Sequence, residues 1–533
     1  MNLFRRALIL SHRYLGIALS LLVVMWFATG IVMMYAGGMP RLTPELRLER
    51  LPALDLPAIS LTPAEAADRG LVLGGGRTTL LTVMDRPAYR FGAGRPVTVF
   101  ADTGEVLEEL TVEQSRQAAS RFVDRPVSDV QYVETLDRID QWTLLQSRQM
   151  PLHKFTVNDG AGTELYVQPQ SADVAMLTTR QSRMLAWMST IPHWMYFTAL
   201  RGNQPLWYRI VVWSAALVCV LAVLGLALGV VQYRRRKPLA AAIPYAGAMR
   251  WHYVTGAVFG IFTLTWAFSG LLSMEPFAWT QAEGLEIERE VFTGGPADLA
   301  AFPAMEPQAW SRLTSGRPIK EVEFTRIQDA NYYLVRHAPD GAFGGEGDRE
   351  RLHQPYPVNG RRDPNRVLVA AASLEVQREP FSVDSLVTRL RGALPEYPIE
   401  EQQLLTEYDS YYYSREGETP LPILRVKFAD PGETWIYVDP EMSQVVASIN
   451  RMNRVERWLY NGLHSMDFAF WYDSIAWDVA MIALSLGGLA SSGIGLVVGV
   501  RRIRRGVART KVEPQRSPYP AVPPRPSPSE DVA

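Results

Sequence analysis

Four long apolar stretches stand out from an otherwise mixed sequence, and each is long enough to cross a membrane. A transmembrane helix needs about 20 mostly apolar residues. The first stretch exceeds the apolar core of a secretory signal, and no small-residue cleavage site follows it cleanly, so we expect it to be retained. The pattern predicts four transmembrane helices, at Tyr14–Tyr35, Leu206–Val231, Tyr253–Met274 and Ile475–Val500.

Basic residues flank these stretches and predict the direction of each helix. All of them fall on one side of a chain that crosses four times, and cytoplasmic flanks carry an excess of Lys and Arg. We therefore expect both termini in the cytoplasm and two long loops on the outer face. The flanking residues are Arg5, Arg6, Arg13, Arg234, Arg235, Arg236, Lys237, Arg250, Arg501, Arg502, Arg504 and Arg505.

This topology divides the chain into nine segments. The tail after Lys511 is rich in Pro and Ser, which predicts disorder. The segments are a cytoplasmic N-terminus at 1–13, a first span at 14–36, a first outer domain at 37–205, a second span at 206–232, a cytoplasmic loop at 233–252, a third span at 253–275, a second outer domain at 276–474, a fourth span at 475–500 and a cytoplasmic tail at 501–533.

Both outer loops contain short segments in which apolar and polar residues alternate, as they do in strands. Helical stretches lie between them, at Val112–Phe122 and Val383–Ala393. The mixture predicts small α+β units, each with an antiparallel sheet and a helix. The expected strands include Thr98–Ala101, Glu164–Val167, Tyr332–Val335, Val367–Ala370 and Trp435–Val438.

The two halves of the chain resemble each other. The pattern His-x3-Gly-x9-Trp-x2-[Thr/Ser]-Gly runs from His12 to Gly30 and again from His252 to Gly270. Together these matches predict two parallel repeats of helix, α+β domain and helix, related by an axis along the membrane normal. Further matches pair Tyr166 with Tyr437, Arg183 with Arg454, Trp187 with Trp458, His193 with His464, Met195 with Met466, Phe197 with Phe468, Trp207 with Trp477, Gly225 with Gly495 and Gly229 with Gly499.

Composition narrows the possible chemistry. The formal net charge is −1, so the chain lacks the overall excess of positive charge that would indicate nucleic-acid binding. The only cysteine is Cys219, which excludes an internal disulfide and a thiolate-held metal or iron–sulfur cluster. A redox metal would therefore need other ligands.

Four of the seven histidines belong to the repeat and fall into two pairs. His12 and His252 are expected at the cytoplasmic start of outward-running helices, and His193 and His464 on the outer side. Two imidazoles facing each other across a twofold axis suit the axial positions of a haem iron. No Cys-x-x-Cys-His motif is present, so the sequence predicts two b-type haems that are not covalently attached.

Other residues near these histidines have candidate roles around the haems. Gly16 and Gly256 lie one turn after their histidines on the same helical face and would leave room for a flat macrocycle. Arg201 and Arg209 near the outer pair could neutralise propionates, as could Arg13 and Arg250 near the inner pair. Met195 and Met466 are expected to pack against the macrocycle or aromatic side chains. Trp26 and Trp266 are expected either to fill helix contacts or to bridge two haems.

Simpler interpretations remain open. A single histidine near a helix end is usually an interfacial polar residue. A directly bound zinc ion normally takes three or four protein ligands, whereas each face offers only two duplicated histidines. His153, His337 and His353 have no counterpart in the other half and are expected in surface positions or loops. Tyr408 and the run Tyr411–Tyr413 could form an aromatic contact surface or, more simply, pack in the sheet region.

The repeated helix motif and the outer domains resemble those of the PepSY-associated transmembrane family, as do the basic residues that follow each inward-running helix. The resemblance covers nearly the whole chain. This resemblance implies PepSY-like periplasmic domains and an inner-membrane location in bacteria. It also implies a haem-dependent siderophore-iron reductase, with His12 and His252 holding the cytoplasmic-side haem and His193 and His464 the periplasmic-side haem. The acceptor would be a ferric siderophore. No dinucleotide-binding glycine motif is found between a strand and a helix, so a separate donor is expected, either a quinol or a cytoplasmic reductase.

Two other functional classes compete with the reductase. PepSY modules also resemble propeptides that inhibit peptidases, so the outer domains could bind a peptidase without being enzymatic. Parallel repeats also occur in transporters. However, four helices can line little of a transport pathway, and no span is expected to carry an intramembrane charge of the kind that marks a substrate route. A homodimer could supply more helices to line such a pathway.

Overall fold

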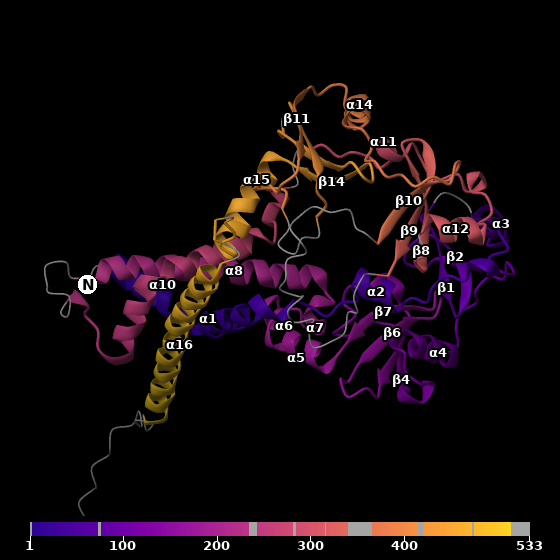
Figure 1. The fold of residues 1–533 in the computed structure, drawn as a ribbon. Helices are drawn as coiled ribbons and strands as arrows, with labels where there is room; N and C mark the ends of the chain where they lie inside the picture. Colours follow the sequence, from indigo (N-terminus) through magenta and orange to yellow (C-terminus); the bar gives the residue numbers. More distant parts are fainter. Residues whose placement is uncertain are drawn as a thin grey trace, which may run out of the picture. The chain divides into compact units, whose positions relative to one another are not determined.

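The computed structural model describes residues 3–72, 76–233, 242–280, 284–314, 316–338, 365–413, 419–468, 470–471 and 474–512. The chain divides into two compact units. The first comprises Met1–Phe27, Leu217–Leu264 and Ala483–Ala533, and the second comprises Ala28–Ala216 and Thr265–Ile482. Four long helices contribute to both units, and the sheets belong to the second unit (Figure 1).

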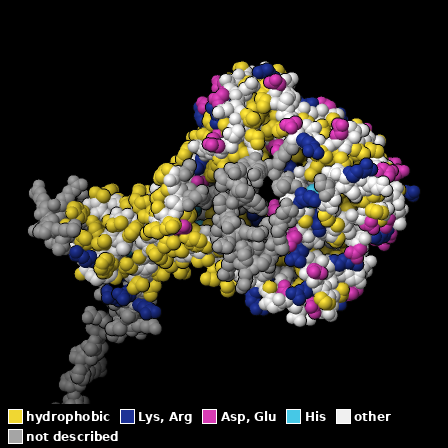
Figure 2. Space-filling model, viewed as in Figure 1, with side chains coloured by type: hydrophobic (Ala, Val, Ile, Leu, Met, Phe, Trp, Pro, Cys, Tyr) yellow, Lys and Arg dark blue, Asp and Glu magenta, His cyan; other side chains and the backbone are white. Residues whose placement is uncertain are grey.

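The four long helices confirm the predicted transmembrane helices and extend several of them. They are α1 (Leu3–Ala36), α8 (Gln204–Gln232), α10 (Gly247–Leu272) and α16 (Ile475–Val512). Each is long and apolar enough to cross a membrane, and Figure 2 shows apolar side chains covering them. The predicted basic flank from Arg234 to Lys237 and the tail from residue 513 lie outside the described residues.

Two charged residues lie inside the predicted bounds of the spans, near one end of α8 and of α16. Asp478 lies in the first turn of α16, where its Oδ1 accepts a hydrogen bond from the Tyr35 hydroxyl at 2.9 Å. Arg209 lies near the start of α8 and is exposed. The expectation that no span carries a charge is therefore corrected for Arg209 and Asp478, both of which fall within the predicted bounds at a span end.

Within the first unit, small residues on α16 let neighbouring helices approach closely. A Cβ added to Gly487 would lie 2.3 Å from the Phe259 ring, and one added to Gly488 would lie 2.2 Å from the Phe27 ring. Such distances are far below van der Waals contact. The aromatic rings of α1 and α10 therefore rest directly on the backbone of α16.

The loops form three antiparallel sheets. One has six strands in the order β10-β9-β8-β1-β2-β3, and the others have the orders β4-β5-β6-β7 and β11-β12-β13-β14. The strands are β1 (Thr78–Val83), β2 (Arg86–Phe91), β3 (Val97–Phe100), β4 (Val130–Leu136), β5 (Leu152–Val157), β6 (Glu164–Gln168), β7 (Asp173–Thr178), β8 (Ile319–Ile327), β9 (Ala330–His337), β10 (Arg366–Ala370), β11 (Ile399–Leu405), β12 (Ile423–Phe428), β13 (Trp435–Asp439) and β14 (Gln444–Ile449).

The six-stranded sheet is shared between the two loops. Strands β1–β3 come from the first loop and β8–β10 from the second, and β1 pairs with β8 in the register Thr78↔Phe324 to Leu81↔Glu321. A core with Trp310, Tyr89 and Tyr333 packs on this sheet. The loops are thus joined through one sheet, whereas the sequence predicted an outer domain for each.

Each loop also contributes one helix that precedes a four-stranded sheet, as predicted. Helix α4 (Val112–Val123) begins with a capping box at Thr111, and α14 (Val383–Ala393) is capped by the Ser382 side chain. Such caps satisfy backbone N–H groups that a helix leaves unpaired at its start. The predicted strands are confirmed within one residue at each end, except Tyr332–Val335, which is two residues shorter than β9 at each end.

Short helices connect these elements. They are α2 (Pro44–Arg50), η1 (Leu56–Ala58), α3 (Pro63–Arg69), η2 (Val127–Asp129), η3 (Ser147–Gln149), α5 (Arg180–Met188), α6 (Thr190–His193), α7 (Thr198–Arg201), η4 (Pro276–Ala278), α11 (Glu290–Thr293), η5 (Leu299–Ala301), α12 (Pro307–Leu313), α15 (Arg451–Arg457) and η6 (Trp458–Gly462), the last with π-helical turns.

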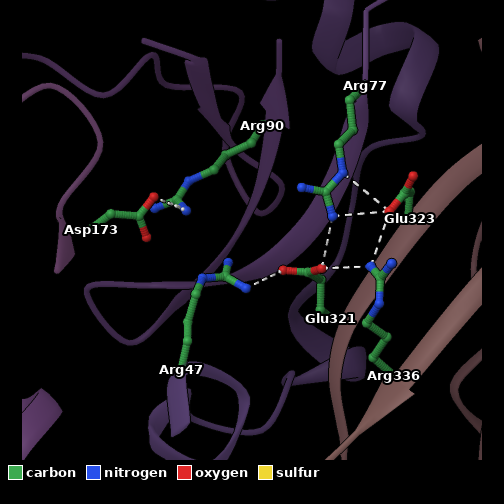
Figure 3. A network of polar contacts seen from close by, with 7 residues as sticks. All are labelled: Arg47, Arg77, Arg90, Asp173, Glu321, Glu323 and Arg336. Carbon is green, nitrogen blue, oxygen red and sulfur yellow. Dashed lines mark hydrogen bonds and ion pairs between the residues drawn. The ribbon is translucent and has the colours of Figure 1, made fainter. Parts of the chain in front are cut away.

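A network of ion pairs crosses the shared sheet (Figure 3). Glu321 on β8 accepts from Arg47 of α2 at 2.9 Å and from Arg336 of β9 at 2.8 Å. Arg77 and Arg336 also pair with Glu323, at 2.9 and 3.0 Å. Burial alone would raise the pKa of Glu321, but the charges of Arg47 and Arg336 outweigh it and hold that pKa below its usual value.

Two of the histidines that have no counterpart in the other half lie where the sequence did not predict them. His153 on β5 is 8% exposed and contacts the Ser115 hydroxyl through Nδ1 at 2.9 Å, and His337 on β9 is 2% exposed with Nδ1 2.9 Å from the Pro318 carbonyl. Both are buried in strands, so the expectation of surface or loop positions was wrong for them. His353 lies outside the described residues. Tyr412 is buried and stacks on Tyr437 at 4.8 Å, so this tyrosine packs on the sheet.

Candidate functional site: two histidine pairs

The first unit brings His12 and His252 together. His12 lies on α1 and His252 on α10, and their ring centroids are 6.2 Å apart with an interplanar angle of 34°. Both side chains are half-buried. Two residues that are 240 positions apart in the sequence therefore face each other, as the repeat pattern predicted.

Each ring of this pair is held by a different neighbouring helix. His12 Nδ1 lies 3.2 Å from the Leu221 carbonyl of α8, and His252 Nδ1 lies 3.0 Å from the Ser491 carbonyl of α16. A carbonyl can only accept, so each Nδ1 carries the proton and donates it. Each Nε2 then keeps its lone pair. This is the arrangement in which a metal-ligating histidine is usually held.

Glycines on the same two helices lie directly beneath these rings. A Cβ at Gly225 of α8 would come within 2.9 Å of His12, and a Cβ at Gly495 of α16 within 3.0 Å of His252. Gly225 follows Leu221 by one helical turn, and Gly495 follows Ser491 in the same way. Each glycine therefore lies on the same helical face as the residue whose carbonyl contacts the imidazole. The bare backbone leaves each imidazole the room that a methyl group would occupy.

The second unit brings His193 and His464 together in the same way. His193 ends α6, and His464 follows the π-helical segment η6. Their ring centroids are 6.5 Å apart with an interplanar angle of 78°. Both are half-buried.

Hydroxyl groups hold this outer pair. Thr29 Oγ1 on α1 lies 3.1 Å from His193 Nδ1, and Ser269 Oγ on α10 lies 3.0 Å from His464 Nδ1. The following glycines make space for the rings, because a Cβ at Gly30 would lie 3.3 Å from His193 and one at Gly270 would lie 3.6 Å from His464. The [Thr/Ser]-Gly end of the repeated motif thus supports the histidine of a different segment.

The protonation of His464 follows from its neighbours. Ser269 Oγ donates its proton to the Trp266 carbonyl at 3.1 Å. Its oxygen therefore accepts from His464 Nδ1–H, which leaves the Nε2 lone pair available for a ligand. Burial lowers the pKa of His464 to about 4, so the ring is neutral at physiological pH.

Each outer histidine lies in a short segment that is tied to the helix after it. The Trp207 indole at the start of α8 donates to the Trp194 carbonyl, and the Trp477 indole at the start of α16 donates to the Ser465 carbonyl, both at 2.9 Å. Met195 and Met466, two residues after their histidines, adopt left-handed backbone angles with φ of 54° and 47°. These contacts fix where each imidazole lies.

The other predicted residues contact neighbouring helices or aromatic rings. A Cβ at Gly16 would meet Leu221 at 3.8 Å and one at Gly256 would meet Ser491 at 3.6 Å, so these glycines face the helices that carry the carbonyl acceptors. Their predicted role beside a macrocycle stays a prediction. Arg201 lies over the rings of Tyr196 and Trp207.

The remaining candidates are Arg13, Arg209, Arg250, Trp26 and Trp266. Arg209 is exposed, whereas Arg13 and Arg250 at the other end of the spans are half-buried. Trp26 and Trp266 are half-buried on α1 and α10. No role was predicted from the sequence for Thr29, Ser269, Gly225 and Gly495, although their duplication was the available signal.

The geometry of both pairs suits a six-coordinate iron. Two imidazole nitrogens that each bind a metal at about 2 Å place their ring centroids about 6 Å apart. The observed centroid distances of 6.2 and 6.5 Å agree with that arrangement. In each pair at least one imidazole is held in the tautomer that leaves Nε2 free to coordinate. Two neutral imidazoles at this separation would therefore fit a haem iron as its two protein ligands.

Four apolar helices, intervening sheets and two facing histidine pairs define a multi-pass membrane protein. The chain belongs to the PepSY-associated TM region family, whose model matches residues 9–502. A comparison with curated proteins gives no match.

Proposed function

We propose that the protein is a di-haem b electron-transfer protein of the bacterial inner membrane. In this proposal it acts as an oxidoreductase that reduces a ferric siderophore on the periplasmic side and releases Fe(II). The single observation that carries the proposal is the convergence of four repeated histidines into two facing pairs at iron-compatible distances.

A b-type haem bound by two histidines supplies a one-electron carrier that cycles between ferric and ferrous states. The chain's own residues would orient and electronically tune each ligand. The Leu221 and Ser491 carbonyls would increase the basicity of His12 and His252 by accepting hydrogen bonds from their Nδ1–H groups. The Thr29 and Ser269 hydroxyls are weaker partners for the outer histidines, so the two sites would differ in reduction potential.

The proposed parallel repeat is supported by equivalent elements in both loops. Each loop provides a three-stranded meander, a capped helix and a four-stranded antiparallel sheet. A Tyr–Asp–cation cluster also recurs: Tyr166 donates to Asp140 at 3.0 Å, and Tyr437 donates to Asp409 at 3.0 Å. Lys154 accompanies the first cluster and Arg425 the second.

The proposed orientation rests on the basic ends of the long helices. Within the described residues, Arg5, Arg6 and Arg13 lie on α1, Arg250 lies on α10, and Arg501–Arg505 belong to α16. All of them belong to the first unit, together with His12 and His252. Because cytoplasmic flanks are basic, this unit would face the cytoplasm. The electron donor would be a separate quinol or cytoplasmic reductase.

Absorption spectroscopy of the detergent-purified protein tests the proposal. We expect a Soret band and, after dithionite, the sharp α and β bands of low-spin haem b. Anaerobic addition of a ferric siderophore should return the oxidised spectrum while a ferrous-specific chelator captures Fe(II). A colourless protein, produced with ample haem supply, would overturn the proposal and favour a membrane-anchored module that binds a peptidase.

The glycine beneath His252 provides a further prediction. Gly495→Ala should place a methyl group 3.0 Å from His252 Cε1 and displace the imidazole. We expect haem affinity at this site to fall about 10–100-fold, as when a metal ligand loses its support. The pyridine haemochrome count should then decrease from two towards one per chain.

Gly493→Ala is the matched control for this substitution. It adds the same methyl group to the same helix, but nothing lies within 4 Å of its Cβ. Equal haem content in the two variants would contradict the proposed role of Gly495.

A further inference from the structure

The first loop contains a cavity of about 60 Å³ whose lining includes none of the four histidines. Its walls come from α2, the β1–β2 hairpin, α4 and the start of β7. A single bound water needs about 10–15 Å³. The cavity therefore has room for a group the size of a phosphate or a carboxylate.

Arginines dominate the lining of this cavity. Four guanidinium groups contribute to it, but only two carboxylates do. Even if Glu321, which pairs with Arg47 from outside the lining, is counted, one positive charge remains in excess. The arginines are Arg47, Arg50, Arg90 and Arg121, and the carboxylates are Asp85 and Asp173.

Arg90 is the most buried of these arginines, and its hydrogen bonding is incomplete. Its side chain is 7% exposed. Nη1 donates to Asp173 at 2.6 Å (Figure 3). Nη2 donates to the Ser171 carbonyl at 2.5 Å. Nε–H is buried and has no hydrogen-bond partner among the residues that the structure describes. A buried donor without a partner is costly, so a bound acceptor would stabilise it.

Arg50 supplies the excess charge. Over the described part of the chain it has no ion pair or hydrogen bond, and it is half-buried at the end of α2. The other two arginines are engaged, because Arg47 pairs with Glu321 at 2.9 Å and Arg121 pairs with Asp85 at 2.8 Å. A ligand would thus meet one unpaired cation and one unpaired buried donor.

We propose that this cavity binds a small oxyanion, a phosphate or a carboxylate group, through Arg50 and Arg90. Guanidinium groups present planar forks of donors that match the oxygens of both ligands. The cavity is bounded by β1 and β2 of the six-stranded sheet and by β7 of a four-stranded sheet, so the ligand would also hold these two sheets together. The site is independent of the proposed redox function.

Calorimetry and thermal unfolding of the full-length, haem-loaded protein test this site, with inorganic phosphate, citrate and chloride at matched ionic strength. We expect saturable binding and a higher Tm with phosphate or citrate, because a ligand that binds only the folded state stabilises it. Arg50→Gln should weaken the affinity roughly tenfold to a hundredfold, the range for one hydrogen bond to a charged group. Stronger binding of phosphate would assign a phosphate ligand, and stronger binding of citrate a carboxylate ligand.

Two further variants complete the design. Arg90→Gln should weaken binding at least as much, but it also leaves Asp173 without its partner. If Arg90→Gln fails to fold, the affinity of Arg50→Gln decides the test. Arg391→Gln removes an exposed guanidinium at the end of α14 and should leave the affinity unchanged. Equal weakening by Arg391→Gln, equal stabilisation by chloride, or no saturable binding would each overturn the proposal.

Discussion

The variant His12→Ala/His252→Ala should retain one haem per chain, whereas His252→Ala/His464→Ala should retain none. The reason is that the first variant removes both ligands of one proposed site, and the second removes one ligand from each of two sites. Pyridine haemochrome counts and the low-spin bands of the reduced protein measure the difference. The ring centroids are 6.2 Å apart in the His12–His252 pair and 6.5 Å apart in the His193–His464 pair. Two substitutions within one pair should therefore affect one haem site only.

Comparison between double variants controls for general damage to the protein. Both variants lose two imidazoles and gain two alanines, so they differ only in how the substitutions are distributed between the pairs. His193→Ala/His464→Ala provides a second test and should also retain one haem. Equal haem content in all three variants would refute the assignment of ligands to pairs.

Loss of the Glu321 carboxylate should strongly destabilise the shared sheet. Its side chain is 2% exposed and accepts from Arg47 and Arg336, with Arg77 at 3.3 Å. Removing one member of a buried ion pair typically costs about 3–5 kcal/mol. The three arginines remain a quarter to a half exposed and can regain water, so we expect Glu321→Ala to lower the unfolding free energy by about 2–3 kcal/mol.

Glu105→Ala is the control for this prediction. Glu105 also pairs with an arginine, Arg86, at 2.9 Å, but its side chain is 63% exposed. An exposed pair contributes less than about 1 kcal/mol. Thermal unfolding of the purified protein should therefore show a drop of several degrees in Tm for Glu321→Ala and little change for Glu105→Ala. Equal Tm values would mean that the network adds nothing to stability.

Local patterns in the sequence were sufficient for the helices and most strands. The run Val383–Ala393 was predicted as a helix with the observed bounds, and its buried residues Leu386, Val387 and Leu390 recur at helical spacing. The apolar spans were equally clear. Duplication also grouped His12 with His252 and His193 with His464, because residues that match across a repeat are expected to face each other across its axis.

Features that depend on distant segments were not predictable from the sequence alone. No local pattern indicates that β1 pairs with β8, since both strands alternate in the same way whichever neighbour they meet. The burial of His153 depends on which side of β5 faces the sheet core. The support that Gly495 and Ser491 give to His252 depends on the approach of α16 to α10, which a sequence does not specify.

The shared sheet also has a consequence for biosynthesis. Strand β1 needs β8 as its neighbour, but about 240 residues separate them, and ribosomes add about 5–20 residues per second. The edge of β1 therefore stays open for on the order of 10–50 s after it is made. An open strand edge is a template for pairing with other chains. A nascent chain that stalls before the second loop would thus carry an aggregation-prone edge, and a chaperone that covers β1 during this interval would favour correct assembly.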